Sequence, residues 1–183
     1  MKKTIPVALF LAGLFLAIPA ISQTSSNTNE KVARQLNLLL QLKGLWETDA
    51  ATMKTGGKEY KFAYYADFKP ASGNKAIVMH EWANIPGMGK LDGNNLAGIN
   101  LSDGKVHWFS VDNMGTTHEH IGEFADDKHF TMTHQGTQDG KEFIEKLEME
   151  LSKPDVLILK QVAMLDGEEV AVINGVFHRK KGN

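Results

Sequence analysis

The chain has 183 residues, a formal net charge of −2 and no cysteine. The absence of cysteine excludes disulfides, thiolate metal sites and cysteine nucleophiles. The charge is small and well mixed, so it gives no electrostatic reason to expect nucleic acid as a partner.

The first 22 residues have the layout of a cleavable secretory signal peptide. Lys2 and Lys3 form a basic start, an apolar stretch follows from Ile5 to Ala20, and small and polar residues end the segment. A membrane-spanning helix needs about 20 apolar residues, and this stretch is shorter. We therefore expect residues 1–22 to be removed from an exported protein, periplasmic or extracellular, without a transmembrane segment.

Residues 23–29 are polar and are predicted to form a flexible leader, and residues 30–181 a single domain. A helix is predicted from Asn27 to about Leu42, because Asn27 and Glu30 have the spacing of a capping box. Its apolar stripe comprises Val32, Leu36, Leu39, Leu40 and Leu42. Such a stripe needs a surface to cover, so we expect the helix to pack on the mouth or wall of the domain that follows. A partner-binding helix is the alternative.

After Gly44 the hydrophobic period changes from 3.6 to 2, which predicts strands. Ten are expected, at Leu45–Met53, Glu59–Phe68, Ala76–Asn84, Asn95–Leu101, Val106–Asp112, Thr117–Ala125, His129–Gly136, Glu142–Leu151, Val156–Leu165 and Glu169–Arg179. The turn signals between them are Gly56-Gly57, Gly73-Asn74, Gly93-Asn94, Asp103-Gly104, Met114-Gly115, Asp126-Asp127, Asp139-Gly140, Pro154-Asp155 and Asp166-Gly167.

Ten strands joined by tight turns predict an all-β fold, a ten-stranded antiparallel up-and-down β-barrel preceded by one short helix. Barrels of this size can hold one ligand inside. The longest connection is expected between Ile85 and Asn94, where a Gly/Pro segment forms either a mobile lid or an irregular loop.

Three short motifs carry a family resemblance. They are Leu39-x-x-Leu42-x-Gly44-x-Trp46-Glu47, Asp112-Asn113-x-Gly115-Thr116 and the closing Phe177-x-Arg179. Together with the strand pattern, they resemble the calycin superfamily of lipocalin-like and fatty-acid-binding-protein-like barrels, and within it a bacterial, often secreted, lipocalin-like domain family of unknown function. The resemblance implies a barrel whose end is closed by Trp46 packed near Arg179. It also implies an internal cavity, which in relatives binds fatty acids, retinoids, bilins or haem.

The histidines are the chemically richest feature of the chain. His118 and His120 are two residues apart on a predicted strand, so their side chains point to the same side, and His80 and Trp82 share a face in the same way. We predict that these faces look inward and that the lumen is lined by Tyr64, His80, Trp82, His118, His120 and His134.

Three interpretations of this cluster stay open. The histidines are satisfied polar residues, polar anchors for a ligand in an apolar pocket, or a metal or catalytic centre with His118 and His120 as candidate metal ligands. The sequence contains no Gly-x-Ser-x-Gly elbow, Walker loop, dinucleotide-binding glycine triplet or His-Glu-x-x-His motif. It requires no cofactor and indicates no catalytic residue.

The sequence therefore favours an exported protein that holds a small hydrophobic or amphipathic molecule inside a barrel. One alternative is a metalloprotein or an enzyme of the isomerase or hydrolase type built on the histidine cluster. The other is a structural or partner-binding module whose barrel is filled by side chains.

Overall fold

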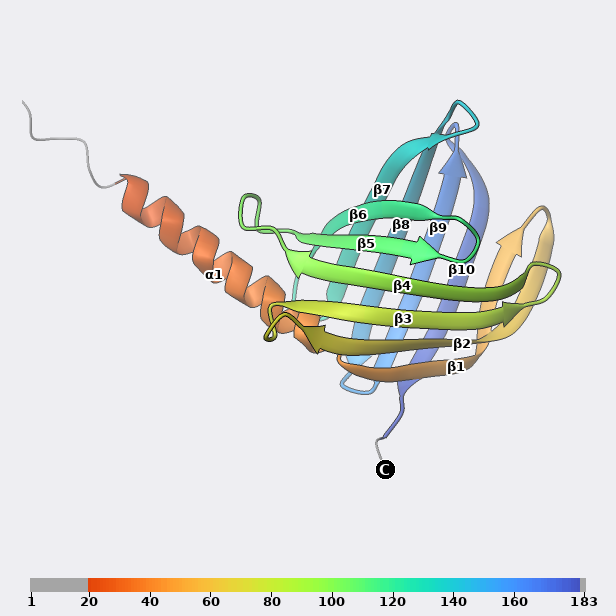
Figure 1. The fold of residues 1–183 in the computed structure, drawn as a ribbon, viewed down its shortest axis with the longest axis horizontal. Coiled ribbons are helices and arrows are strands. Elements are labelled where there is room, and N and C mark those ends of the chain that lie inside the picture. Colours follow the sequence, from red (N-terminus) through yellow and green to blue (C-terminus); the bar gives the residue numbers. More distant parts are fainter. Residues whose placement is uncertain (1–19, 182–183) are drawn as a thin grey trace, which may run out of the picture.

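Ten antiparallel strands close into a barrel in the computed structural model, which describes residues 20–181 (Figure 1). The strands are β1 (Gly44–Thr55), β2 (Lys58–Ala71), β3 (Ala76–Ile85), β4 (Gly89–Ile99), β5 (Val106–Asp112), β6 (Thr117–Phe124), β7 (His129–Gln138), β8 (Lys141–Lys153), β9 (Val156–Leu165) and β10 (Glu168–Arg179). Each strand pairs with the next in sequence, and β1 pairs with β10. The predicted fold class is confirmed.

Alternation of side chains places the core inside the barrel. On β2, for example, Phe62, Tyr64 and Phe68 are buried, whereas Lys61 before them and Lys69 after them are exposed. Successive side chains of a strand point to opposite faces of the sheet, so an alternating sequence gives one dry and one wet face. Because β1 pairs with β10, none of the ten strands is an unpaired edge strand.

One helix, α1 (Ala20–Leu40), precedes the barrel. It begins earlier than predicted and includes residues 23–29, which we expected to form a flexible leader. No Gly or Pro occurs between Ala20 and Lys43, so nothing in this polar stretch interrupts a helix. Most of the predicted signal peptide, residues 1–19, lies outside the described residues. Within residues 20–181, no helix has both the length and the apolar character needed to span a membrane.

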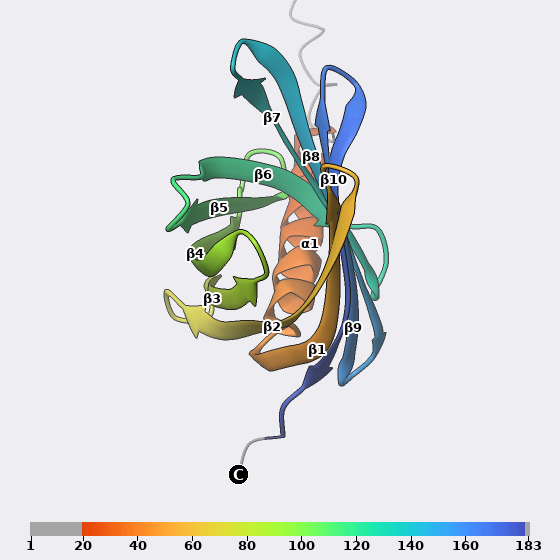
Figure 2. The same ribbon diagram turned by 90° about the vertical axis from the view of Figure 1, so that its right-hand side faces the viewer.

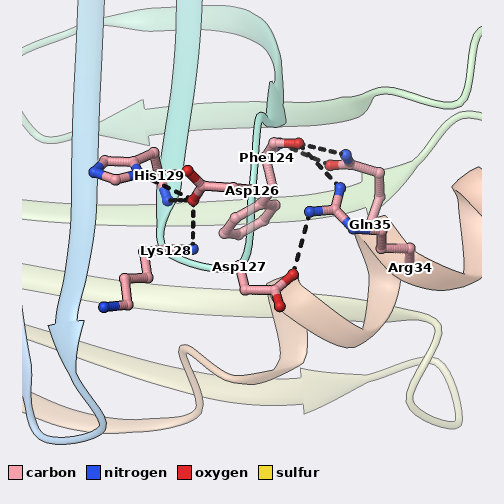
Figure 3. Close-up of polar contacts among 7 residues, drawn as sticks. All are labelled: Arg34, Gln35, Phe124, Asp126, Asp127, Lys128 and His129. Carbon is pink, nitrogen blue, oxygen red and sulfur yellow. Dashed lines mark hydrogen bonds and ion pairs between the residues drawn. The ribbon is translucent and has the colours of Figure 1, made fainter.

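The C-terminal part of α1 lies across one end of the barrel, behind the ring of strands in Figure 2. Leu38 and Leu39 of α1, with Leu42 just after it, are buried in the barrel core. The side chain of Gln35, only 1 % exposed, bonds to the backbone of Phe124 at the end of β6 (Figure 3). The helix therefore closes this end.

The connection between β3 and β4 differs from the prediction. Strand β4 begins at Gly89, so the expected long segment from Ile85 to Asn94 is a tight turn followed by strand. Gly93, expected in a turn, lies inside β4 opposite Glu81. A Cβ atom at Gly93 would lie 2.9 Å from Glu81 Oε1. The glycine marks a close approach of a side chain to the backbone. The long connection, which we expected to form either a mobile lid or an irregular loop, is replaced by the tight turn before Gly89.

Candidate ligand-binding cavity

The barrel encloses a cavity of about 250 Å³. Met88 and Met114, both half-exposed, stand at its rim in the turns after β3 and β5. These turns lie at the end opposite α1, because the chain leaves the helix at Gly44 and reverses direction at every turn. The cavity is therefore closed by α1 at one end and approached from the other.

The cavity wall is mostly apolar, and residues from all ten strands contribute to it. The large apolar side chains that line it include Met53, Phe68, Met79, Leu91, Trp108, Met132, Leu147, Met149, Leu157, Leu159, Ile173 and Phe177. Unbranched methionine side chains adapt their shape more easily than branched ones. Such a wall suits an apolar molecule without fixing its outline.

A chain of hydrogen bonds crosses one side of the cavity, from β5 to β2. Trp108 Nε1 donates to Asn95 Oδ1 at 3.0 Å, and Asn95 Nδ2 donates to Glu81 Oε1 at 2.9 Å. The Tyr64 hydroxyl donates to the other oxygen of Glu81. Burial, and then the Glu81 carboxylate, raise the pKa of Tyr64 well above its ordinary value. Tyr64 therefore stays protonated and keeps donating to Glu81.

A second polar group lies where β6, β8 and β9 face the cavity. Glu145 on β8 approaches two histidines of β6, with Oε1 at 3.3 Å from His120 Nε2 and Oε2 at 3.9 Å from His118 Nε2. Gln161 on β9 donates from Nε2 to Glu145 Oε1. These groups are buried: His120 is 3 % exposed and Glu145 is 8 % exposed.

The environment sets the protonation of this group. Burial opposes the charged form of Glu145, but the neighbouring imidazoles, first that of His120, outweigh burial and lower its pKa. Burial also lowers the pKa of His118, and the nearby His120 and His134 add to this, although Glu145 opposes it. The favoured state is an ionised Glu145 beside a neutral His118.

Three of the six predicted lumen residues line the cavity, and a fourth, His134, contacts one of them without lining it. Tyr64, His118 and His120 line the cavity. His134 lies on β7. The centre of its ring is 4.5 Å from that of His118, and its Nδ1 is 2.9 Å from the Glu119 carbonyl oxygen.

The prediction that His80 and Trp82 face the lumen is wrong. The His80 side chain is 48 % exposed and contacts Asp92, and Trp82 stacks between Tyr65 and His80 on the outer surface. Glu81, which lies between the two, points inward instead. The physical reason is that the inward apolar set of β3 comprises Ile77, Met79, Ala83 and Ile85, which share the parity of Glu81.

Sequence reasoning missed Glu81, Asn95, Glu145 and Gln161 as cavity residues. For Glu145 a signal was present, because it has the parity of the apolar residues Phe143, Leu147 and Met149 on β8. A lone carboxylate on the dry face of a strand is a candidate functional group, since an isolated buried charge is costly. Gln161 gave no comparable signal.

At the helix end, the structure also brings Trp46 and Arg179 together. Trp46 is fully buried, and the guanidinium carbon of Arg179 lies 4.4 Å from the centre of its ring. Arg179 Nη1 donates to the Lys43 carbonyl at 2.5 Å and Nη2 to the Gln41 carbonyl at 2.7 Å. The pair ties the last strand to the end of α1.

Comparison with known proteins places the chain by its fold. No family model and no curated protein sequence matches it. Among solved structures, it is similar to the S-type phycobiliprotein lyase CpeS from Guillardia theta, with 9 % identity and a TM-score of 0.59 over 85 % of this chain and 98 % of that one. A protein of unknown function of the DUF3598 family from Nostoc punctiforme matches with 9 % identity over 80 % of this chain and 99 % of that one, at a TM-score of 0.24. The likeness to the Guillardia theta structure shows a shared fold, and the calycin resemblance of the sequence stays a prediction.

Proposed function

We propose that this protein is an exported binding protein that holds one small apolar or amphipathic molecule in the barrel cavity. The single observation that carries the proposal is the cavity itself, an apolar space of about 250 Å³ with a few converging polar groups. That combination is the usual anatomy of a small-molecule site. It also argues against the alternative of a barrel filled by side chains.

The size of the cavity limits the ligand. Sites for drug-sized molecules enclose about 300–1,000 Å³, so this cavity suits a smaller molecule, or one whose tail enters while its remainder stays at the rim. Burial of apolar surface contributes about 25 cal/mol per Å², less the cost of immobilising the ligand. Half-exposed Met88 and Met114 at the rim would cover the part that stays outside.

The charges of the wall indicate the ligand's polar group. Glu81, Asp112 and Glu145 contribute carboxylates, and no Lys or Arg occurs among the described residues that line the cavity. A ligand carboxylate would meet like charges there, whereas a hydroxyl or an amine would find hydrogen-bond acceptors. We therefore favour an alcohol or amine over a free fatty acid.

The other lines of support are broader. The layout of residues 1–22 supports export. The likeness to the Guillardia theta protein, a phycobiliprotein lyase, supports a barrel scaffold of the calycin type. The ligand class rests on the cavity of this chain.

The test is a titration of chelator-treated protein with 1-decanol, decylamine and decanoate, which share an apolar chain and differ in the polar group. Trp108 lines the cavity, so its fluorescence reports binding. We expect decanol and decylamine to bind, and decanoate to bind about tenfold more weakly, a difference of about 1.4 kcal/mol. Equal or tighter binding of decanoate would overturn the assignment of the polar group, and no binding of any of the three would overturn the ligand proposal.

Two matched variants locate the binding. Ala66→Phe adds a ring inside the cavity and is expected to abolish the titration, whereas Ala63→Phe adds the same ring on the outer face of β2 and should leave it intact. The signal should persist in Trp82→Phe, because Trp82 lies outside the barrel. A signal that survives Ala66→Phe would place the binding elsewhere.

A further inference from the structure

We propose that His118, His120 and Glu145 form a binding site for one divalent transition-metal cation, Zn²⁺ or Fe²⁺, in the wall of the cavity. The proposal is independent of the organic ligand, because it concerns the donor atoms of three side chains. Its first support is that one donor atom from each residue lies within 4.8 Å of the others.

The second support is an unsatisfied histidine. Among the described residues, neither Nδ1 nor Nε2 of buried His120 has a hydrogen-bond partner. Its approach to Glu145 is close, at 3.3 Å, but is not aligned as a hydrogen bond. A buried polar group without a partner costs about 1–3 kcal/mol, so natural proteins seldom leave one. A cation between His120 and Glu145 would bond to Nε2 of His120 and to the carboxylate of Glu145.

The spacing of the donors suits a tetrahedral ion. Bonds of about 2.0–2.1 Å place the ligand atoms of Zn²⁺ about 3.3–3.4 Å apart. The pair formed by His120 Nε2 and Glu145 Oε1 has this spacing, at 3.3 Å. His118 Nε2 lies 3.9 Å from the other carboxylate oxygen, so the His118 donor must move closer for all three residues to reach one ion.

The donor set has suitable chemistry. Two imidazoles and one carboxylate occur in catalytic zinc sites and in the facial triad of non-haem iron proteins. Imidazole nitrogens and carboxylate oxygens are ligand atoms that both Zn²⁺ and Fe²⁺ accept.

Surrounding residues hold two of the three ligands, Glu145 and His118, in place. Gln161 donates to Glu145, and His134 stacks on His118 while its own Nδ1 contacts the Glu119 carbonyl oxygen. Metal ligands are commonly oriented by such outer contacts. Gln161 and His134 are thus positioning residues.

The site leaves one coordination position open. All three ligands line the cavity, so the fourth position of a tetrahedral ion would face the cavity interior. Three protein ligands with an open position distinguish catalytic metal sites from structural ones, which are closed. A water molecule or a polar group of the cavity ligand would occupy it.

The experiment uses chelator-treated protein without a polyhistidine tag. We expect it to bind Zn²⁺ with a stoichiometry of one per chain by calorimetry, to gain thermal stability with Zn²⁺, and to give the visible absorption of tetrahedral Co²⁺. His120→Ala and Glu145→Gln should lose all three signals. His118→Ala, at the less buried ligand, serves as a further variant if either fails to fold by circular dichroism.

Two comparisons make the test specific. His80→Ala and His129→Ala remove exposed histidines that pair with Asp92 and Asp126, and both should keep stoichiometric binding. Gln161→Leu should weaken binding about 10–100-fold, as expected for loss of an outer contact. Binding that survives loss of His120, or that is lost with His80 or His129, would overturn the proposal, as would the absence of stoichiometric binding in the natural sequence.

Discussion

The side-chain amide of Gln35 in α1 forms two hydrogen bonds with the backbone of Phe124 in β6. Nε2 donates to the Phe124 carbonyl oxygen at 2.9 Å, and Oε1 accepts from the Phe124 N–H at 2.8 Å (Figure 3). The amide thus pairs with the end of a strand as another strand would. This relationship fixes where the helix closes the barrel.

Replacing Gln35 by Ala should lower the free energy of unfolding by about 1–3 kcal/mol, because the buried Phe124 N–H loses its partner and the carbonyl keeps only the longer bond from Arg34 Nη1, at 3.4 Å. Arg34→Ala is the matched control. Arg34 forms an exposed ion pair with Asp127 at 3.2 Å and a long bond to the Phe124 carbonyl, which keeps its shorter bond from Gln35, so loss of Arg34 should cost less than about 1 kcal/mol. Urea denaturation measures both, and equal effects would contradict the assigned role of Gln35.

Arg179→Ala should also destabilise the fold, by about 2 kcal/mol or more, since it removes two charged hydrogen bonds and the contact with Trp46. Arg179→Lys should recover less than half of this loss, because a single ammonium cannot reach both carbonyls while lying over the ring. Lys180→Ala, which removes an exposed pair with Glu47, is the control. Chemical unfolding that ranks Lys180→Ala with Arg179→Ala would refute the prediction.

Gly93→Ala tests the close approach of Glu81 to β4. The new methyl group would collide with the Glu81 carboxylate at 2.9 Å, and we expect a loss of about 1–3 kcal/mol. At Gly98 on the same strand, a Cβ would meet nothing nearer than 3.8 Å, so Gly98→Ala should stay within about 1 kcal/mol of the natural sequence. Thermal unfolding of the two variants measures both effects. An unchanged stability in Gly93→Ala would show that Glu81 is free to move.

Acid should destabilise the metal-free protein in two steps. The pKa of His118 is lowered from 6.5, so below pH 6.5 the unfolded chain binds more protons than the folded one and stability falls as pH falls. The pKa of Glu145 is lowered from 4.5, so its contribution is full above pH 4.5 and is lost as pH falls below it. His120, His134 and Asp112 also act on these groups.

Variants separate the two steps. His118→Gln should flatten the dependence of unfolding free energy on pH between about pH 7 and 5, whereas Glu145→Gln should flatten it mainly below about pH 5. Urea titrations at a series of pH values measure both slopes. An unchanged slope in His118→Gln above pH 5 would show that His118 does not carry the first step.

The amino-acid sequence by itself determined the barrel. Alternation of apolar and polar residues after Gly44 and the regular turns predicted ten strands in their observed order, because side-chain parity and turn chemistry are local properties. The family resemblance carried by Gly44, Trp46 and Arg179 indicated which ends of the chain meet. The error at Gly93 arose because a strand glycine that admits a neighbouring side chain reads locally as a turn.

Only the tertiary structure decided which residues share the cavity. Parity shows that two side chains lie on one face, but not which face is inward when apolar residues occur on both, as they do around His80 and Trp82. Parity also cannot bring Glu145 and Gln161 beside His118 and His120, because that proximity depends on the curvature and closure of the sheet. A polar cluster built across three strands is a property of the closed barrel, and the alternation within any one strand does not contain it.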